Sequence, residues 1–532
     1  MSSSSLSLSV LLQKRRRRHR IILFIIAIAA TSLLLIPDDS INSFTTMPSR
    51  RLNSSLSPEE EAQEVTTTTY TDLIRKDVPL PRYNLESTIK AADIYRSRFA
   101  LLRYDPTTDN FIGYYSKKHE WVTGCNKLIE SIRVLTTLLR NLFPERFTTD
   151  APELVLGVSS GDYPSVNRIY KACIYNDEEQ GSSSSSSSPC NESLRTASPV
   201  LHFGSVFVNP IFPNIIGCPM PGDHLNCFHD WIMKGGQPCS KFSPTPQGYV
   251  LPWEELIPQL VWRGTDFRFL QIQNDLSRPT DWNFLDKILQ TKSSTVHRGV
   301  LTRKLRENYH KMIPRWKGVL YTAESEAVAS RTRTLAKINI KFSHVAEGGR
   351  HSAIGSKEYK TFEDAGFPVA GEYMNGLQLA KYKYQIDLGG GGGTTWTGTV
   401  NKLGMPGLLF HHVTPTKDYI HDHIQPWVHY VPVRSDLEDL LEKLEWAETH
   451  PNEAKQISEN ATELMRKLSS SEGFEPLFRQ DLFKPLQAVI EAYTPMNLRD
   501  EEAWMGQFEQ LGGDSMRAFI ECTNKRVCNI IK

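Results

Sequence analysis

Several features are scarce or missing in this chain of 532 residues. It has no Asp-x-Asp triplet, the short carboxylate motif that holds a divalent metal against a phosphate group. Basic residues are not in excess beyond residue 20. The first twenty residues contain six of the 61 lysines and arginines, so the remainder carries 55 basic and 60 acidic residues, a net charge of −5. A nucleic-acid-binding body is therefore not expected, because such a body needs a basic surface.

One long apolar run follows the basic cluster, at residues 21–36. As a helix its sixteen residues would span about 24 Å, which suits the thin membrane of the endoplasmic reticulum or early Golgi. Positive charge before the run keeps that end cytosolic, so a single-pass signal anchor would place the rest of the chain in the lumen. A cleaved signal peptide is the alternative. Both interpretations send the body into the secretory pathway.

Cysteine is absent from the first 124 residues, and all eight cysteines follow the apolar run. In an oxidising lumen they are expected to form disulfides, whose pairing the sequence leaves open. Zinc binding by Cys218, Cys227 and Cys239 with His224 and His229 is the less favoured alternative. N-glycosylation sequons at Asn53, Asn191 and Asn460 permit modification in that compartment.

The spacing of apolar residues predicts an α/β protein. Amphipathic patterns predict helices at 86–104 and 125–143, and an apolar run predicts a strand at 153–159. Beyond residue 250, strands and helices alternate, which is typical of a parallel sheet. The predicted elements are strands at 259–264, 383–388 and 406–412, with helices at 296–312 and 435–448.

The chain is divided by composition into six segments. The segment at 37–84 is rich in Ser, Thr, Pro and Glu and predicts a disordered stem. The serine tract at 182–188 predicts an exposed loop without chemistry. The predicted segments are a cytosolic basic tail (1–20), the signal anchor (21–36), the stem (37–84), an N-terminal α/β domain (85–250), a C-terminal α/β domain (251–480) and a helical return with a tail (481–532).

A run of five glycines follows the predicted strand at 383–388. Residues 389–393 free the backbone to wrap closely around a ligand, and successive amides in such a loop can cradle a diphosphate. A glycine run by itself is more often a flexible connection. The segments on either side of the glycine run favour ligand binding. In chain order they are K-Y-K-Y-Q-I-D-L before the glycines, then W-T-G, and further on P-W-V-H-Y-V-P-V.

This order resembles glycosyltransferase family 90, which includes the Rumi-type protein O-glucosyltransferases and the fungal capsule-associated xylosyltransferases. The resemblance is clearest over 261–450 and continues faintly upstream to about residue 154. It implies a GT-B-like fold of two Rossmann-type domains facing a cleft, with the domain at 85–250 on the acceptor side and the domain at 251–480 binding the donor. It also implies inverting transfer from a UDP-sugar, with glucose or xylose as the sugar, to a hydroxyl of a protein or glycan acceptor. Neither a metal nor another cofactor is expected.

The resemblance also suggests a catalytic base and donor-binding residues. Asp162, in S-G-D-Y-P, matches the family's catalytic Asp, although an Asp before Tyr-Pro is also a common turn residue. The segment W-R-G-T matches a donor-binding motif with Arg263, Gly264 and Thr265, and Arg263 could equally form a structural ion pair. Arg298 matches the arginine that meets the diphosphate, with Arg303 as second choice.

The glycine loop completes the predicted donor site. Many relatives carry an arginine directly after their W-S-G, where this chain has Thr399, so one phosphate contact is missing or supplied from elsewhere. Asp418 suits a ribose hydroxyl or is an ordinary surface carboxylate. The loop residues expected to contact the donor are Gly391, Gly392, Gly393, Trp396, Thr397 and Gly398.

Alternatives to a transferase remain open at this point. Six residues between 411 and 429, His411, His412, His421, Asp422, His423 and His429, could suggest a metal, but their spacing matches no metal signature. A lumenal protein that binds a sugar nucleotide or glycan without turnover is suggested by Thr399. A purely structural membrane-tethered protein would have no use for the glycine loop.

Overall fold

The structure is a computed structural model, and the chain divides into two compact units, Met1–Ser57 and Pro58–Lys532. All described residues belong to the second unit, so the predicted anchor and almost all of the predicted stem lie outside them. No helix in the described ranges is long and apolar enough to cross a membrane. The described residues are 80, 82–94, 99–116, 127–160, 198–207, 222–267, 269, 296–345, 351–395, 397–496 and 508–510.

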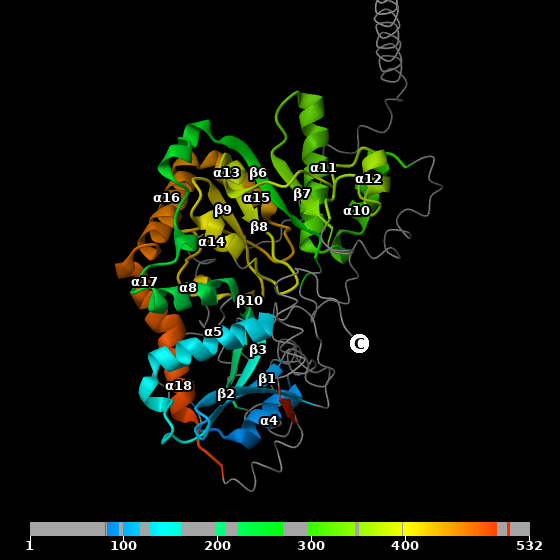
Figure 1. The fold of residues 1–532 in the computed structure, drawn as a ribbon. Helices are drawn as coiled ribbons and strands as arrows, with labels where there is room; N and C mark the ends of the chain where they lie inside the picture. Colours follow the sequence, from blue (N-terminus) through cyan, green and yellow to red (C-terminus); the bar gives the residue numbers. More distant parts are fainter. Residues whose placement is uncertain are drawn as a thin grey trace, which may run out of the picture. The chain divides into compact units, whose positions relative to one another are not determined.

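A five-stranded parallel sheet forms the framework of the C-terminal half (Figure 1). Its spatial order is β11-β9-β8-β6-β7, and every neighbouring pair is parallel. Numbered along the chain from one to five, the order is 2-1-3-4-5, a doubly wound arrangement with a switch point between β6 and β8. The strands are β6 (Ile257–Thr265), β7 (Ile338–His344), β8 (Tyr382–Asp387), β9 (Leu408–His412) and β11 (Val431–Val433).

Helices cover this sheet and bury an aliphatic and aromatic core. The longest of them, α11, packs against β7. Gly318 permits this close approach, since a Cβ there would lie 2.8 Å from Ile340 Cγ2. The helices are α10 (Arg298–Glu307), α11 (Pro314–Thr332), α12 (Lys360–Asp364), α13 (Gly376–Leu379), α14 (Thr397–Leu403), α15 (Leu440–Thr449) and α16 (Pro451–Leu468). The predicted strands and helices of this half are confirmed, with α10 and α15 shorter than expected.

The N-terminal half contains a second sheet of different construction. Its order is β12-β2-β1-β3-β4, and only the β3–β4 pair is parallel. The expectation of two Rossmann-type sheets is therefore wrong for the described part of this half. The elements are α4 (Leu85–Ile94), β1 (Phe99–Asp105), β2 (Asn110–Ser116), α5 (Lys127–Leu142), β3 (Leu154–Ser160), β4 (Val200–Phe203), α8 (Gly222–Met233) and β12 (Phe508–Gln510).

The predicted helix at 86–104 is correct only in its first half. Helix α4 ends at Ile94, and β1 begins at Phe99. Strand β1 pairs with β2 on one side and β3 on the other, and Phe99 to Leu102 are all buried. An apolar run buried on both faces carries no alternation, so periodicity could not separate this strand from the helix before it.

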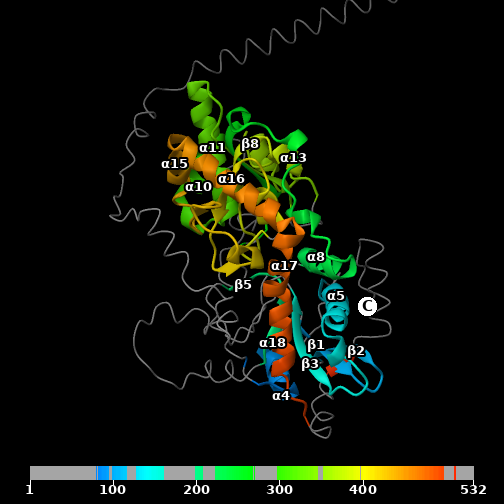
Figure 2. The ribbon, with the colours of Figure 1, turned by 90° about the vertical axis from the view of Figure 1, so that its left-hand side faces the viewer.

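Two short structures join the halves. Strand β5 (Val206–Phe207) pairs antiparallel with β10 (Thr416–Lys417). The chain then returns through α17 (Ser471–Phe478), a π-helical turn (Arg479–Phe483) and α18 (Lys484–Ala492), seen in orange to red in Figure 2. Leu482, Leu486 and Val489 of this return share one core with strands β1, β3 and β4.

Short 3-10 turns and one disulfide complete the described structure. The Cys227–Cys239 disulfide joins α8 to the turn at Ser240–Phe242. Disulfide formation is thus confirmed for this pair, and the other six cysteines lie outside the described residues. The other 3-10 turns are Pro144–Arg146, Gln247–Tyr249, Trp253–Glu255, Tyr309–Lys311 and η8 (Tyr419–Asp422).

Candidate functional site

The carboxyl ends of β6 and β8 meet at the switch point of the parallel sheet, where doubly wound proteins bind ligands. Arg315, at the start of α11, spans the two ends. Its Nη1 donates to the Thr265 carbonyl at 2.6 Å, and its Nη2 donates to the Leu388 carbonyl at 2.9 Å. The guanidinium also lies over the Trp262 ring, 5.1 Å from its centroid. A buried positive charge is therefore fixed at the base of the glycine loop.

The glycine loop is folded back on itself and buried. The Gly390 amide donates to the Thr394 carbonyl, and the Gly393 amide donates to the Gly390 carbonyl. Gly393 has a φ of +86°, which disfavours any residue with a Cβ. Within the described part of the chain, the buried amides of Gly391 and Gly392 donate to no acceptor. Buried amides normally have a partner, so these two are suited to an anionic ligand.

Asp387, the last residue of β8, lies beneath the loop and is 1% exposed. Its Oδ2 accepts from Thr399 Oγ1 at 2.6 Å and lies 2.8 Å from His411 Nδ1, and its Oδ1 accepts from the His412 amide at 3.0 Å. Burial alone would raise the pKa of this carboxyl. The charge and hydrogen bond of His411, together with Lys402 and Thr399, outweigh burial and hold the pKa below its usual value. Asp387 is therefore an ionised anchor for the strand end, the loop and α14.

Two histidines near the loop are held neutral. Burial lowers the pKa of His412 to about 4, and its Nδ1 accepts from the Gly389 amide at 3.1 Å. Burial and the neighbouring charge of His411 lower the pKa of His421 to about 3. These contacts identify His412 and His421 as structural histidines. Among the described residues, no three His, Cys, Asp or Glu side chains are placed to hold a metal ion.

A buried hydroxyl and carboxylate cluster joins the loop to the N-terminal half. Ser205, just beyond β4, lies 2.5 Å from Thr394 Oγ1 and donates to Asp418 Oδ1 at 2.9 Å. Thr394 Oγ1 donates to the same carboxylate oxygen at 3.1 Å. Asp418 is 1% exposed, so it is not the surface carboxylate of the alternative interpretation. Its position beside the loop is compatible with the predicted contact to a donor.

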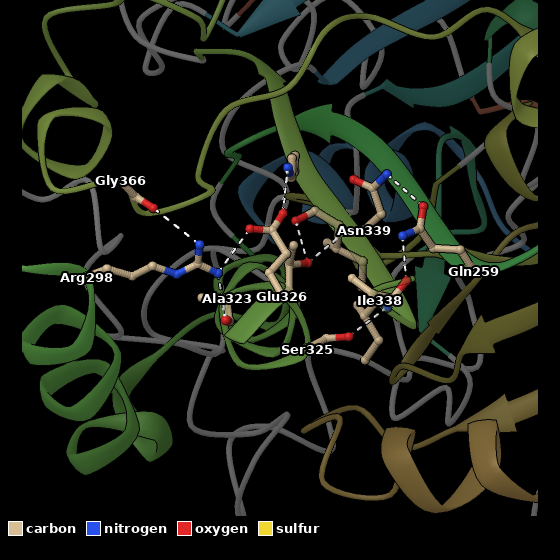
Figure 3. A network of polar contacts seen from close by, with 12 residues as sticks. Gln259, Arg298, Ala323, Ser325, Glu326, Ile338, Asn339 and Gly366 are labelled. Carbon is tan, nitrogen blue, oxygen red and sulfur yellow. Dashed lines mark hydrogen bonds and ion pairs between the residues drawn. The ribbon is translucent and has the colours of Figure 1, made fainter. Parts of the chain in front are cut away.

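The predicted donor-binding arginines Arg263 and Arg298 lie in polar networks that do not include the glycine loop. Arg263 donates to the carbonyls of Trp262, Asn339 and Glu372 and to Asn339 Oδ1. Arg298 donates to the Ala323 carbonyl and pairs with Glu326 at 3.0 Å (Figure 3). Ala323 follows Arg315 by eight residues of α11, so about 12 Å of helix separates the Arg298 contact from Arg315.

The structure brings together part of the predicted site. Thr265 meets the loop through Arg315, Asp418 meets it through Thr394, and the Gly398 amide donates to the Thr395 carbonyl at 2.9 Å, which joins α14 to the loop. Gly264 packs its backbone against the Trp262 ring, so a side chain would not fit there. Asp162 and Trp396 lie outside the described residues, so their predicted roles stay predictions.

Sequence reasoning missed Arg315, Asp387 and Lys402. Asp387 carried a usable signal, because it ends a strand directly before the glycine run. Arg315 carried none, because it precedes Leu388, at the base of the loop, by 73 residues and only the fold brings them together. Lys402 lies one helical turn beyond Gly398, and its Nζ donates to the Gly398 carbonyl at 3.3 Å.

Comparison with known proteins gives matches to a part of the chain. Protein O-glucosyltransferase 2 of Danio rerio is 44% identical over 93 residues, which are 16% of this chain and 17% of the relative. Protein O-glucosyltransferase 3 of Homo sapiens is 33% identical over 101 residues, 18% of each chain. The protein of the same name from Rattus norvegicus is 33% identical over 91 residues, 16% of each chain. The chain therefore spans about a sixth of the length of these curated relatives.

The family model described as Glycosyl transferase family 90 matches residues 361–474. This range includes β8, the glycine loop, α14, β9, η8 and β11, which together carry most of the site. The resemblance predicted from the motifs is thus confirmed, and residues 361–474 are the segment through which this chain matches glycosyltransferase family 90.

Proposed function

We propose that this protein is a glycosyltransferase that moves a sugar from a UDP-sugar to a hydroxyl of a protein or glycan acceptor. The observation that carries the proposal is the glycine loop. Two buried amides that have no acceptor among the described residues lie at the switch point of a parallel sheet, within the segment that matches glycosyltransferase family 90. Glucose is the favoured sugar, because the relatives are named protein O-glucosyltransferases, and xylose is the second choice.

The acceptor side of the reaction is assigned to Asp162. Its carboxylate takes the proton of the acceptor hydroxyl while the oxygen attacks the anomeric carbon, and the bond to the UDP oxygen breaks on the opposite face. The product therefore has inverted configuration. Asp162 follows the end of β3 by two residues. Strand β3 is parallel to β4, and Ser205 just beyond β4 reaches the glycine loop.

The donor side is assigned to the loop and its surroundings. Amides of the loop and the start of α14 meet the departing diphosphate, and Asp418 faces the ribose. The roles predicted for Arg263 and Arg298 remain part of the proposal, although both guanidinium groups already donate to protein acceptors. We propose a transfer that needs no metal, with positive side chains and amides compensating the charge of the leaving group.

A second candidate is a protein that binds a sugar nucleotide without turnover. Thr399 favours this candidate, because it replaces an arginine of many relatives and donates to Asp387. A missing charge-assisted contact costs about 1.5–3 kcal/mol, enough to weaken catalysis without abolishing donor binding.

The cellular location of the protein is also part of the proposal. The apolar run at 21–36 would anchor the chain in the membrane of the endoplasmic reticulum or Golgi, with the body in the lumen. The Cys227–Cys239 disulfide supports an oxidising compartment.

Release of UDP by the purified full-length protein tests the function. A panel of UDP-sugars is offered with EDTA present, to the natural chain and to Asp162→Asn. Release from one donor that survives EDTA and disappears in the variant supports a metal-free transferase and identifies the sugar. Binding of UDP without release from any donor, even with acceptor proteins added, supports the second candidate.

A further inference from the structure

Lys402 has an unusual position for a lysine of a short helix. It lies in the last turn of α14, yet its side chain runs back to the start, and its Nζ lies 3.6 Å from the point where a Cβ on Gly398 would be. The side chain is half-buried. Its ammonium donates to the Gly398 carbonyl and forms no ion pair among the described residues. A half-buried ammonium with one weak neutral acceptor is incompletely compensated.

Nearby charges do not supply the missing partner. Asp387 is close enough to interact electrostatically with Lys402, but its two oxygens are bonded to Thr399, His411 and the His412 amide. Arg315 is a second positive charge in the same field, with its Nη2 2.9 Å from the point where a Cβ on Gly390 would be. Burial and this like charge lower the pKa of Lys402, with Asp387 acting in the opposite direction.

The residue at position 399 brings no positive charge to the glycine loop, although many relatives carry an arginine there. Thr399 is 0% exposed, and its hydroxyl is shared between Asp387 and Thr395. An arginine at this position would point its charge at the same carboxylate and loop, but a threonine brings no charge. Lys402, three residues further along α14, returns a positive charge to this end of the loop.

We propose that Lys402 binds the diphosphate of the nucleotide donor and supplies the charge that Thr399 lacks, with Arg315, which spans the ends of β6 and β8, as a second cation. This inference rests on the proposed function, since it assumes a nucleoside diphosphate at the glycine loop. It assigns the charge compensation of the leaving group to side chains outside the predicted motif arginines.

The test is titration calorimetry of the full-length protein with UDP, uridine and inorganic pyrophosphate. Lys402→Met is expected to weaken UDP and pyrophosphate binding about 10- to 100-fold, the range for a charge-assisted contact, and to leave uridine binding unchanged. Lys402→Arg keeps the charge and should bind UDP within about threefold of the natural chain. Lys360→Met is the matched control, because Lys360 is 71% exposed and pairs with Asp364 on the surface.

The outcomes separate the inference from the proposed function. Failure of the natural chain to bind UDP overturns both. If Lys402→Met binds UDP as tightly as the natural chain does, the inference alone is overturned. An equal weakening of UDP binding and uridine binding would indicate a structural effect and would also overturn the inference. Pyrophosphate binding as tight as UDP binding would show a site for free diphosphate and overturn the nucleotide assignment.

Discussion

Replacing Asp387 by asparagine should destabilise the protein strongly. The side chain is 1% exposed and receives three hydrogen bonds, two of which lie at 2.8 Å or less. An asparagine oxygen can keep only part of this set, and its amide nitrogen would face donor groups. Each charged hydrogen bond contributes about 1.5–3 kcal/mol, and removal of one partner of a buried pair costs about 3–5 kcal/mol. Since the neighbouring groups can rearrange locally, we expect the free energy of unfolding to fall by about 2–4 kcal/mol.

The loss is measured as a lower melting temperature, by circular dichroism or differential scanning fluorimetry. At about 2–4 °C per kcal/mol for a domain of this size, the melting temperature should fall by roughly 4–16 °C. Asp364→Asn is the control, because Asp364 is 63% exposed and pairs with Lys360 on the surface, where such pairs contribute about 0–1 kcal/mol. Equal melting temperatures for the two variants would refute the view of Asp387 as an anchor.

The pH dependence gives the same argument a second test. The pKa of Asp387 is lower in the folded chain than its ordinary value of about 3.9, so its stabilisation is complete above that pH. It is lost as the pH falls through the folded value. The difference between the natural chain and Asp387→Asn should therefore be constant near neutral pH and shrink in acid. A difference that grows below pH 4 would contradict the assigned sign.

Three further predictions concern stability. Because the pKa of His412 is about 4 in the folded chain and about 6.5 in the unfolded chain, this group should lower the free energy of unfolding by about 2 kcal/mol between pH 7 and 4.5. A flat urea-denaturation profile over that range would exclude this. Replacing Cys227 and Cys239 by serine together should cost about 3 kcal/mol, through the freed loop of the unfolded chain, and an unchanged denaturation midpoint would argue against the bridge. Gly393→Ala should cost about 1–2 kcal/mol because of its positive φ, whereas Gly248→Ala, in open space, should change little; equal effects would remove the conformational explanation.

Local patterns predicted the parallel half well. Strand β8 and the loop after it were visible because alternation and the glycine run are properties of neighbouring residues. Strand β1 was missed because its partners β2 and β3 bury both of its faces, and that information lies outside the segment. The same limit explains why the mostly antiparallel pairing of the N-terminal sheet was not predicted. Whether two neighbouring strands run parallel or antiparallel is set by the connections between them and not by the strands themselves.

The site shows a similar division. Motifs placed the glycine loop and Asp418 correctly beside each other, because the family order fixes both. The positive charges could not be assigned in this way. An arginine in a motif can be occupied by structural acceptors, as Arg298 is with Glu326, and an arginine outside any motif can be brought to the loop by the start of a helix, as Arg315 is.

The return of the chain through α17 and α18 has a consequence during synthesis. The core around β1, β3 and β4 includes Leu482, Leu486 and Val489, so it cannot close until roughly 280 residues after β4 have been made. At about 5–20 residues per second, this delay lasts on the order of 15–60 s. During that time the apolar strands of the first half are uncovered. The nascent chain therefore depends on chaperone protection, and a stop codon before α18 would leave an aggregation-prone product although the parallel sheet of the C-terminal half is complete.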